Sequence, residues 1–211
     1  MTVSATPEGL TTLHGTVTPE GASVPPGVAP RRSTRGNIVD AAVALIADRG
    51  FSATSVDDIA TAAGVAKGSV YYNFGSKTAL FEAVIVEGVG RLTTALRAAV
   101  DGLQGAAAID ALVTELLAQV QSHPDFAKLV VAEVFRTGRD WQDSIRQVRE
   151  QSMAVFAEVV AAAWPDRDPS LTAAAMFGAT LVAGLEWLAF QPHRPMADVR
   201  AAVLATVLAS S

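Results

Sequence analysis

The side chains between Lys67 and Phe74 are of types that can contact a nucleic acid, and their spacing divides them between two faces of a helix. At about 3.6 residues per turn, Val70 and Phe74 fall on one face, and Gly68 and Tyr72 fall on the other. A glycine permits close approach to base edges, a tyrosine hydroxyl can donate to a phosphate oxygen, and a lysine can contact either. The pattern predicts a short helix that packs by one face and binds nucleic acid by the other.

Lys77 follows Ser76 at the expected start of the next helix. A cation in the first turn opposes the positive end of the helix macrodipole, which is unfavourable when the turn stands alone. Beside the free amides of that turn and the Ser76 hydroxyl, the same cation completes a site for an anion. We therefore expect Lys77 to bind a phosphate group.

Two short helices, over residues 56–63 and about 67–73, are predicted to meet at a tight turn. Ser55 and Asp58 have the spacing of a capping box at the start of the first helix. Gly64 can take the left-handed backbone conformation that the turn needs, and small Ala60 lets the helices approach closely. The expected apolar contacts between the two helices are those of Ile59, Val65 and Val70. This arrangement is that of a helix-turn-helix, whose second helix enters the major groove of DNA.

The segment from Thr54 to Leu80, TSVDDIATAAGVAKGSVYYNFGSKTAL, resembles the DNA-binding domain of the TetR family of transcriptional regulators. The most specific part is the run from Lys67 to Lys77, in which Lys-Gly-Ser is followed by Tyr-Tyr, Phe and Ser-Lys. The similarity extends without a gap over about residues 34–80. It implies an all-helical homodimer in which three N-terminal helices read DNA and a C-terminal helical bundle senses a ligand.

Carried over by position, the resemblance implies DNA contacts at nine residues. Lys67 and Gly68 are expected to approach bases, and Asn73 to contact either a base or a phosphate. The expected phosphate contacts are those of Thr54, Ser55, Ser69, Tyr71, Tyr72 and Lys77. Asp57 departs from the basic or polar residue common in the family. An acid there suits the helix dipole but repels a phosphate, so no contact is expected from it.

Other interpretations of this region stay open. The segment could be an ordinary helical hairpin with solvated polar residues, and Tyr71 could pack beside the apolar face. The run GVAKGS at residues 64–69 is not a phosphate-binding loop, because it lacks both the lysine after the second glycine and a preceding strand. Arg31, Arg32 and Arg35 could form a basic arm beside the duplex, as some members of the family use.

The rest of the chain is also predicted to be helical, so the expected fold class is all-α. Thr34 is the expected cap of a first helix that ends at Gly50, and a long helix is expected from Lys77 to about Leu103. The apolar stripe of the first helix consists of Ile38, Ala42, Leu45 and Ile46. Further amphipathic helices are predicted over residues 107–121, 125–138, 140–163, 170–190 and 196–209.

Three regions are expected along the chain. Residues 1–30 hold five of the ten prolines and are predicted to be a disordered leader. Residues 31–80 form the predicted helix-turn-helix DNA-binding domain, and residues 81–211 the helical effector-binding and dimerisation domain. The leader lacks the basic start and apolar run of a secretory signal, so a cytoplasmic location is expected.

Composition argues against several classes of function. The chain has no cysteine and three scattered histidines, so we expect no disulfide, no metal site and no cofactor. The stretch from Pro169 to Leu185 is uncharged but shorter than the roughly 20 apolar residues that span a bilayer, so we expect no membrane association. No paired acid and base or activated nucleophile stands out, so we do not expect an enzyme.

Charge is distributed unevenly along the chain. Residues 31–80 carry six basic and four acidic side chains, whereas residues 81–211 carry ten basic and fifteen acidic ones. A mildly basic block on an acidic body is compatible with a nucleic-acid reader.

A cavity for a small effector is expected among the middle helices. Its expected apolar wall residues are Phe126, Phe135, Trp141, Met153, Phe156, Met176 and Phe177, and its expected polar residues are His123 and Glu133. An ordinary core position is the alternative interpretation of each, and for His123, which precedes Pro124, a plain loop position.

The segment from Leu171 to Phe190 is apolar on nearly all sides and rich in alanine and glycine. A helix with so few polar positions must be covered on most faces, and a partner subunit is the simplest cover. Together with residues 201–208 it is expected to form half of a four-helix dimer interface. The expected interface residues are Leu171, Ala174, Ala175, Gly178, Val182, Leu185, Val203 and Leu204. Burial inside the monomer is the alternative.

Taken together, these expectations describe a dimeric, DNA-binding transcriptional regulator. We expect a repressor that a small apolar effector releases from a palindromic operator on double-stranded DNA. Two rival hypotheses are an enzyme or ligand-binding module in the C-terminal bundle without DNA-dependent regulation, and a structural or membrane-associated helical module.

Overall fold

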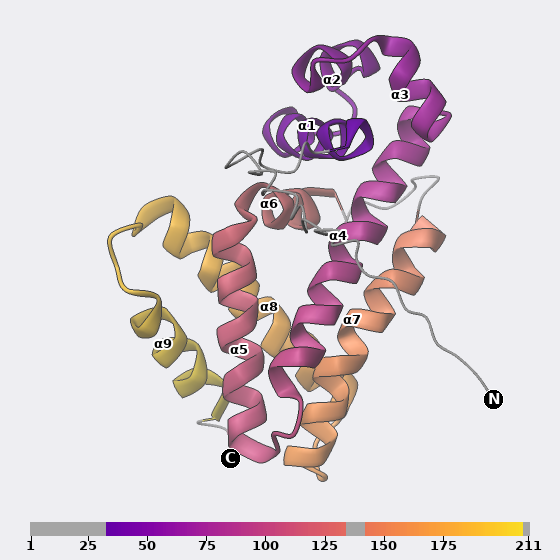
Figure 1. Ribbon diagram of the computed structural model, residues 1–211. Helices are drawn as coiled ribbons and strands as arrows, with labels where there is room; N and C mark the ends of the chain where they lie inside the picture. Colours follow the sequence, from indigo (N-terminus) through magenta and orange to yellow (C-terminus); the bar gives the residue numbers. More distant parts are fainter. Residues whose placement is uncertain (1–32, 134–141, 209–211) are drawn as a thin grey trace, which may run out of the picture. The chain divides into compact units, whose positions relative to one another are not determined.

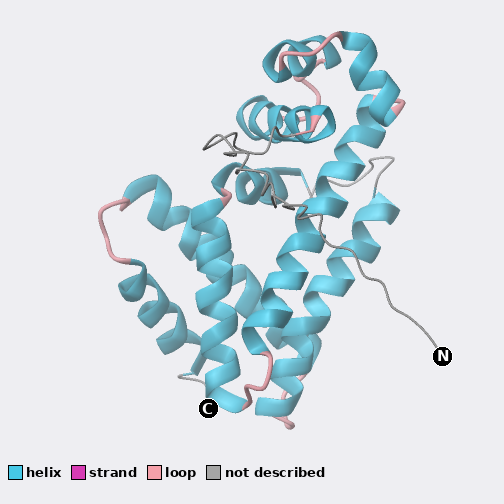
Figure 2. Cartoon of the chain, in the orientation of Figure 1, coloured by secondary structure: helices cyan, strands magenta, loops and turns pink. Residues whose placement is uncertain are grey.

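The computed structural model describes residues 33–133 and 142–208, and every regular element in these ranges is an α-helix (Figure 2). The all-α prediction is therefore confirmed, whereas the leader predicted over residues 1–30 lies outside the described residues. The helices of Figure 1 are α1 (Thr34–Arg49), α2 (Val56–Ala63), α3 (Lys67–Phe74), α4 (Lys77–Val100), α5 (Gly105–Ser122), α6 (Pro124–Glu133), α7 (Gln142–Ala163), α8 (Pro169–Phe190) and α9 (Met196–Leu208).

Local capping contacts set the ends of the first helices. Ser33 caps α1 by accepting a hydrogen bond from the first turn at 3.1 Å, so the cap precedes the predicted Thr34 by one residue. The capping box of α2 is confirmed. Ser55 Oγ accepts from the Asp58 N–H at 3.1 Å, and the Asp58 carboxylate accepts from the Ser55 N–H at 3.0 Å. Gly64 has a φ of 66°, and this left-handed conformation ends α2.

One apolar core joins the first four helices. Each helix contributes a buried side chain, represented by Ile38, Ile59, Val70 and Phe81 from α1 to α4 in order. Leu129 of α6 is fully buried in the same cluster. The core beneath the predicted DNA-binding helices therefore includes a helix from the C-terminal part of the chain.

A second core lies among α5, α7 and α8 and also includes Leu96 of α4 and Ala127 of α6, with apolar side chains of α9 packed beside it. Its fully or almost fully buried members include Ile109, Phe156 and Met176. Arg200 of α9 donates two hydrogen bonds, each of 2.7 Å, to the carboxylate of Asp110 on α5. This bidentate pair fixes α9 against α5.

The connection between α4 and α5 differs from its prediction. α4 ends at Val100, three residues before the predicted Leu103, and α5 begins at Gly105 instead of at residue 107. Gly102, with a φ of 70°, lies in the connection. A left-handed residue cannot continue a right-handed helix, so the chain turns there. The end of α6 predicted at residue 138 lies outside the described residues.

Of the described helices, α8 has 22 residues and is long and apolar enough to cross a membrane by length and composition, so the length argument made from the stretch Pro169 to Leu185 does not hold. A buried core helix has the same properties, and α8 packs against α5, α7 and α9. Asp168 caps its start by accepting from the Leu171 N–H at 2.8 Å. Leu171, Val182 and Phe190 are exposed, so one face of α8 is apolar and uncovered within the described chain.

The side chain of Thr54, in the loop before α2, forms hydrogen bonds to the C-terminal end of α1. Its side chain is 1% exposed, and its hydroxyl lies 3.0 Å from the Gly50 carbonyl oxygen and 3.3 Å from that of Leu45. The hydroxyl therefore satisfies backbone acceptors that have little access to water.

We predict that Thr54→Val lowers the free energy of unfolding by about 1–2 kcal/mol, because a valine of similar shape leaves these carbonyl groups without their donor. Urea denaturation followed by circular dichroism measures the change. The matched control is Thr94→Val, which removes an exposed hydroxyl that donates within α4. Equal losses in the two variants would contradict the role given to Thr54.

Candidate nucleic-acid interface

Backbone hydrogen bonds hold the turn between α2 and α3. The Gly64 N–H donates to the Thr61 carbonyl at 3.1 Å, and the Val65 N–H donates to the Ala60 carbonyl at 3.0 Å. Ala60 is 4% exposed, which agrees with its predicted role as a small residue that lets α2 and α3 approach closely. The apolar contacts predicted for Ile59, Val65 and Val70 are present, with Val65 half-buried.

The outward face of α3 is accessible. Tyr72 is 92% exposed and Tyr71 is 45% exposed, whereas Val70 on the opposite face is 1% exposed. Gly68 is exposed, and a Cβ built on it would meet no atom within 4 Å. The division of α3 into a packed and an open face is therefore as the sequence predicts.

Ser69 and Asn73 lie at the edge of this face, and both are half-buried. The Asn73 side-chain amide donates to the Ser69 carbonyl oxygen at 2.7 Å. One amide hydrogen of Asn73 is thus used within α3, and its other polar atoms are those that could contact DNA.

Lys67 at the start of α3 is paired with Asp57 of α2 across the turn. Its Nζ donates to the Asp57 carboxylate at 2.8 Å, and both side chains are exposed. The hydrogen bond to Asp57, followed by the charge of that carboxylate, raises the pKa of Lys67. Lys67 therefore keeps its proton at neutral pH, but a carboxylate beside it offsets its attraction for a phosphate. In the sequence, Asp57 is an unusual residue for its position, but its pairing with Lys67 is not apparent. The two residues are ten positions apart, and only the turn between α2 and α3 brings them together.

Ser55 remains exposed, but its hydroxyl is already engaged with Asp58. The Oγ atom donates to the Asp58 carboxylate at 2.7 Å and accepts from its N–H. The hydroxyl and then the N–H of Ser55 lower the pKa of Asp58. A phosphate contact at Ser55 therefore has to share or replace a hydrogen bond of the capping box.

The phosphate contact predicted for Thr54 needs correction. The side chain is buried, and its hydroxyl is used on carbonyl groups at the end of α1. Thr54 positions the interface through the loop before α2 and does not form part of its surface.

Lys77 begins α4, next to the cap residue Ser76, whose hydroxyl accepts from the Ala79 N–H at 3.0 Å. The Lys77 Nζ lies over the ring of Phe51, 4.2 Å from its centroid. A cation over an aromatic face is stabilised by the ring quadrupole. This contact offers a structural reason for a lysine in the first turn, in addition to the predicted phosphate.

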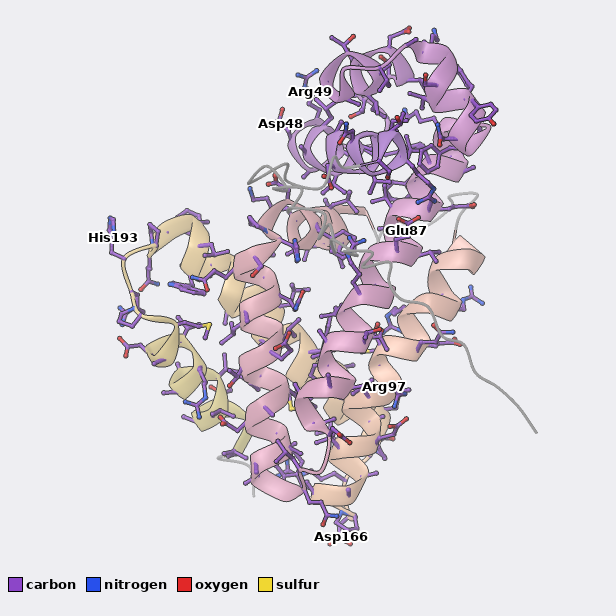
Figure 3. The ribbon with its side chains drawn as sticks, viewed as in Figure 1. Asp48, Arg49, Glu87, Arg97, Asp166 and His193 are labelled. Carbon is purple, nitrogen blue, oxygen red and sulfur yellow. The ribbon has the colours of Figure 1, made fainter. Side chains whose placement is uncertain are left out.

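Arg35 is one of the three arginines that could form a basic arm, and in the structure it makes contacts within its own subunit. Its guanidinium lies 4.9 Å from the centroid of the Phe74 ring and pairs with Glu87 of α4, a side chain labelled in Figure 3. Arg35 therefore joins α1 to both α3 and α4. Arg31 and Arg32 lie outside the described residues.

Two cavities of about 250 Å³ each lie near the middle of the described chain. The first, between α1, α4, α5, α6 and α8, is lined by the predicted residues His123, Phe126 and Phe177. The second, between α4, α6, α7 and α8, is lined by Phe126, Met153 and Phe177. Phe156 and Met176 line neither, because both are buried in the packed core.

Three other residues were predicted to line the effector cavity. The side chain of Glu133 and all of Phe135 and Trp141 lie outside what the structure describes. Sequence reasoning missed the contribution of α4 to both cavities, including Leu92, and it missed Arg149 of α7, which lines the second. The spacing of apolar residues along α4 could have indicated that this helix lines a cavity. Nothing in the sequence distinguishes Arg149 from any other exposed arginine.

The predicted dimer residues divide into three groups. Leu171, Ala175 and Val182 are exposed on α8, and the half-buried positions are Ala174, Gly178, Leu185 and Leu204. Val203 is 5% exposed and packs with Leu117 and Trp187. The assignment of Val203 to an interface is therefore corrected, because α9 uses that side chain to pack against its own subunit.

Comparison with known proteins agrees with this geometry. The family model described as bacterial regulatory proteins, tetR family, matches residues 38–84, which run from α1 into α4. The repressor KstR2 of Rhodococcus jostii is 40% identical over 81 residues, which are 38% of this chain and 40% of that protein. The activator FasR of Mycolicibacterium smegmatis is 40% identical over 70 residues, 33% of this chain and 32% of that protein. The matched segments thus span about two fifths or less of these relatives.

Solved structures extend the similarity of fold to most of the chain. The ketosteroid regulator KstR2 of Mycobacterium tuberculosis has a TM-score of 0.69 at 24% identity, covering 85% of this chain and 95% of that one. FadR of Bacillus subtilis, in complex with stearoyl-CoA, has a TM-score of 0.71 at 18% identity, covering 81% and 96%. Residues 38–84 therefore carry a DNA-binding domain of the TetR family, and the solved structures show the same fold over most of the chain.

We predict that Asp57→Asn tightens binding to duplex DNA, because it removes a carboxylate near the phosphates and leaves Lys67 without its ionic partner. The plot of log affinity against log salt should steepen by about one unit, as expected for one more phosphate neutralised. Fluorescence anisotropy with a labelled duplex at several salt concentrations measures both quantities.

The control is Asp166→Asn, which makes the same change in net charge far from α3 (Figure 3). If both variants change the affinity equally, the effect comes from net charge alone and the proposed pairing of Asp57 with Lys67 has no part in DNA binding.

Proposed function

We propose that this protein is a DNA-binding transcriptional regulator that acts in the cytoplasm. The observation that carries the proposal is the open face of α3 from Lys67 to Tyr72, on a helix-turn-helix that matches the family model. Its base contacts come from Lys67 and Gly68. Its phosphate contacts come from Ser55, Ser69, Tyr71, Tyr72 and Lys77, with Asn73 contacting either group. Repression is the proposed outcome, since KstR2 and IcaR are named as repressors or negative regulators.

The proposed functional unit is a homodimer. Leu171, Val182 and Phe190 expose large apolar surface on one side of α8, and Ala175 lies among them. A second copy of the chain covers this surface most simply, because a two-fold axis brings the same patch of each subunit together. Two α3 helices related by that axis then enter successive major grooves about 34–36 Å apart on a palindromic site.

The proposed effector is an apolar molecule with one anionic end. The second cavity is lined mainly by aliphatic and aromatic side chains, and Arg149 is the charged residue that lines it within the described chain. Burying apolar surface supplies the affinity, and the guanidinium fixes the orientation. One structural neighbour, FadR of Bacillus subtilis, is in complex with stearoyl-CoA, whose acyl chain is an apolar body of this kind.

Selection from a pool of random duplexes tests the proposal. The wild-type protein should enrich an inverted repeat, and its affinity for the selected operator should fall steeply with salt. Lys77→Ala should weaken binding and reduce the salt slope by about one unit, whereas Tyr72→Ala should weaken binding with little effect on the slope. Failure to enrich any sequence, together with binding that salt does not affect, would contradict the proposed function.

The dimer gives a separate prediction. Ala175→Glu should raise the dimer dissociation constant at least about 100-fold, since like charges brought together across a two-fold axis cost several kcal/mol. Sedimentation equilibrium at micromolar concentration measures the association. The matched control is Ala98→Glu, the same substitution at an exposed position of α4. A wild-type monomer, or a dimer that neither substitution weakens, would assign the exposed face of α8 to another purpose.

A further inference from the structure

The two cavities share a wall, and the ring of Phe126 is part of it. Phe126 lines both cavities, as do Leu92 and Phe177 from neighbouring helices. The two spaces are therefore adjacent, and the side chains between them decide whether a ligand can occupy one or both.

The ring of Phe126 lies directly against the backbone of α4 at Gly88. A Cβ built on Gly88 would overlap the Cε2 and Cζ atoms of the ring and lie 2.9 Å from its Cε1 atom. Carbon atoms in contact are about 3.5–4.0 Å apart. The absence of a side chain at Gly88 is thus what allows the ring to occupy this position.

The same contact borders the DNA-binding helices. Phe126 packs against the core that joins α1 to α4, and Leu129, one turn further along α6, is fully buried in that core. Val39 and Val43 of α1 line the first cavity directly. A movement of the Phe126 ring away from Gly88 therefore changes the support of α1 as well as the shape of both cavities.

We propose that the two cavities are halves of one ligand site, and that an effector acts by displacing the Phe126 ring from Gly88. Arg149 binds the anionic end of the effector in the second cavity, and its apolar chain extends past the position of the ring into the first. The displaced ring moves α6 relative to α4 and α1, so that the two α3 helices of the dimer no longer fit one operator. This inference rests on the proposed DNA-binding function and deepens its regulation.

The cavity volumes set a length for the ligand. A cavity of about 150 Å³ holds a benzene molecule of six carbons, so about 250 Å³ holds a chain of about ten. A shorter chain fits in one cavity and leaves the ring in place. In the proposed site a longer chain extends from one cavity into the other and displaces the ring.

The first experiment uses Gly88→Ala without any ligand. The added methyl group should displace the ring and weaken binding to the selected operator about 5–150-fold, the range typical of coupling between sites. Gly90→Ala is the matched control, because a Cβ there meets no atom within 4 Å, and its affinity should stay within about twofold of wild type. Circular dichroism and thermal melting confirm that each variant is folded.

A double-mutant cycle with Phe126→Ala identifies the ring as the cause. Gly88→Ala should weaken operator binding when Phe126 is present and have no further effect when Phe126 is alanine. If folded Gly88→Ala binds as tightly as wild type, or weakens binding equally in both backgrounds, the inference is wrong. Wild-type binding to the operator is the separate check on the proposed function.

The second experiment does not depend on the Gly88 variant. Octanoate and hexadecanoate, each below its micelle concentration, are added to the wild-type complex with DNA. Hexadecanoate should weaken operator binding at least fivefold and octanoate should not, and Phe126→Ala should lose this difference because no ring remains to be displaced. Equal effects of the two chains on the wild type, or no effect of either, would overturn the proposed site.

Discussion

The packing of one face of α3 against the core of α1, α2 and α4 is the contact on which the rest of the structure depends. α3 has eight residues and no side-chain cap at its start, so it is too short to be stable alone in water. Val70, which is almost fully buried, holds it in the core. Because a helix fixes the angle between successive side chains, this burial also turns Gly68 and Tyr72 outward. The surface offered to DNA is thus a consequence of apolar packing on the opposite side.

The second constraint is that α6 belongs to both cores. Leu129 is buried with the side chains of α1 to α4, whereas Ala127 is buried with those of α5, α7 and α8. Close-packed interiors transmit displacements, so α6 cannot shift in one core without disturbing the other. A boundary near residue 80 is apparent in the sequence, but the apolar packing continues across it. The proposed ligand cavities consequently border the DNA-binding helices directly.

Much of the fold follows from local signals in the sequence. The capping box at Ser55, the left-handed turn at Gly64 and the apolar stripe of α1 depend on residues only a few positions apart, and each is found in the structure. The two faces of α3 follow from helical periodicity in the same way. Where the sequence carries weaker signals, as in the connection around Gly102, the predicted helix ends are displaced by two or three residues.

The sequence alone therefore determined the helices, the turn and the outward face of α3, because hydrogen bonding and periodicity act over one or two turns. Tertiary structure alone decided the roles of individual polar and apolar side chains. The side chain of Thr54, which was expected to contact a phosphate, is buried against the end of α1, and Lys67 faces Asp57 across the turn. Gly88 matters because Phe126 arrives from another helix. Such contacts join residues distant in the chain, and only the packing of the helices establishes which of them meet.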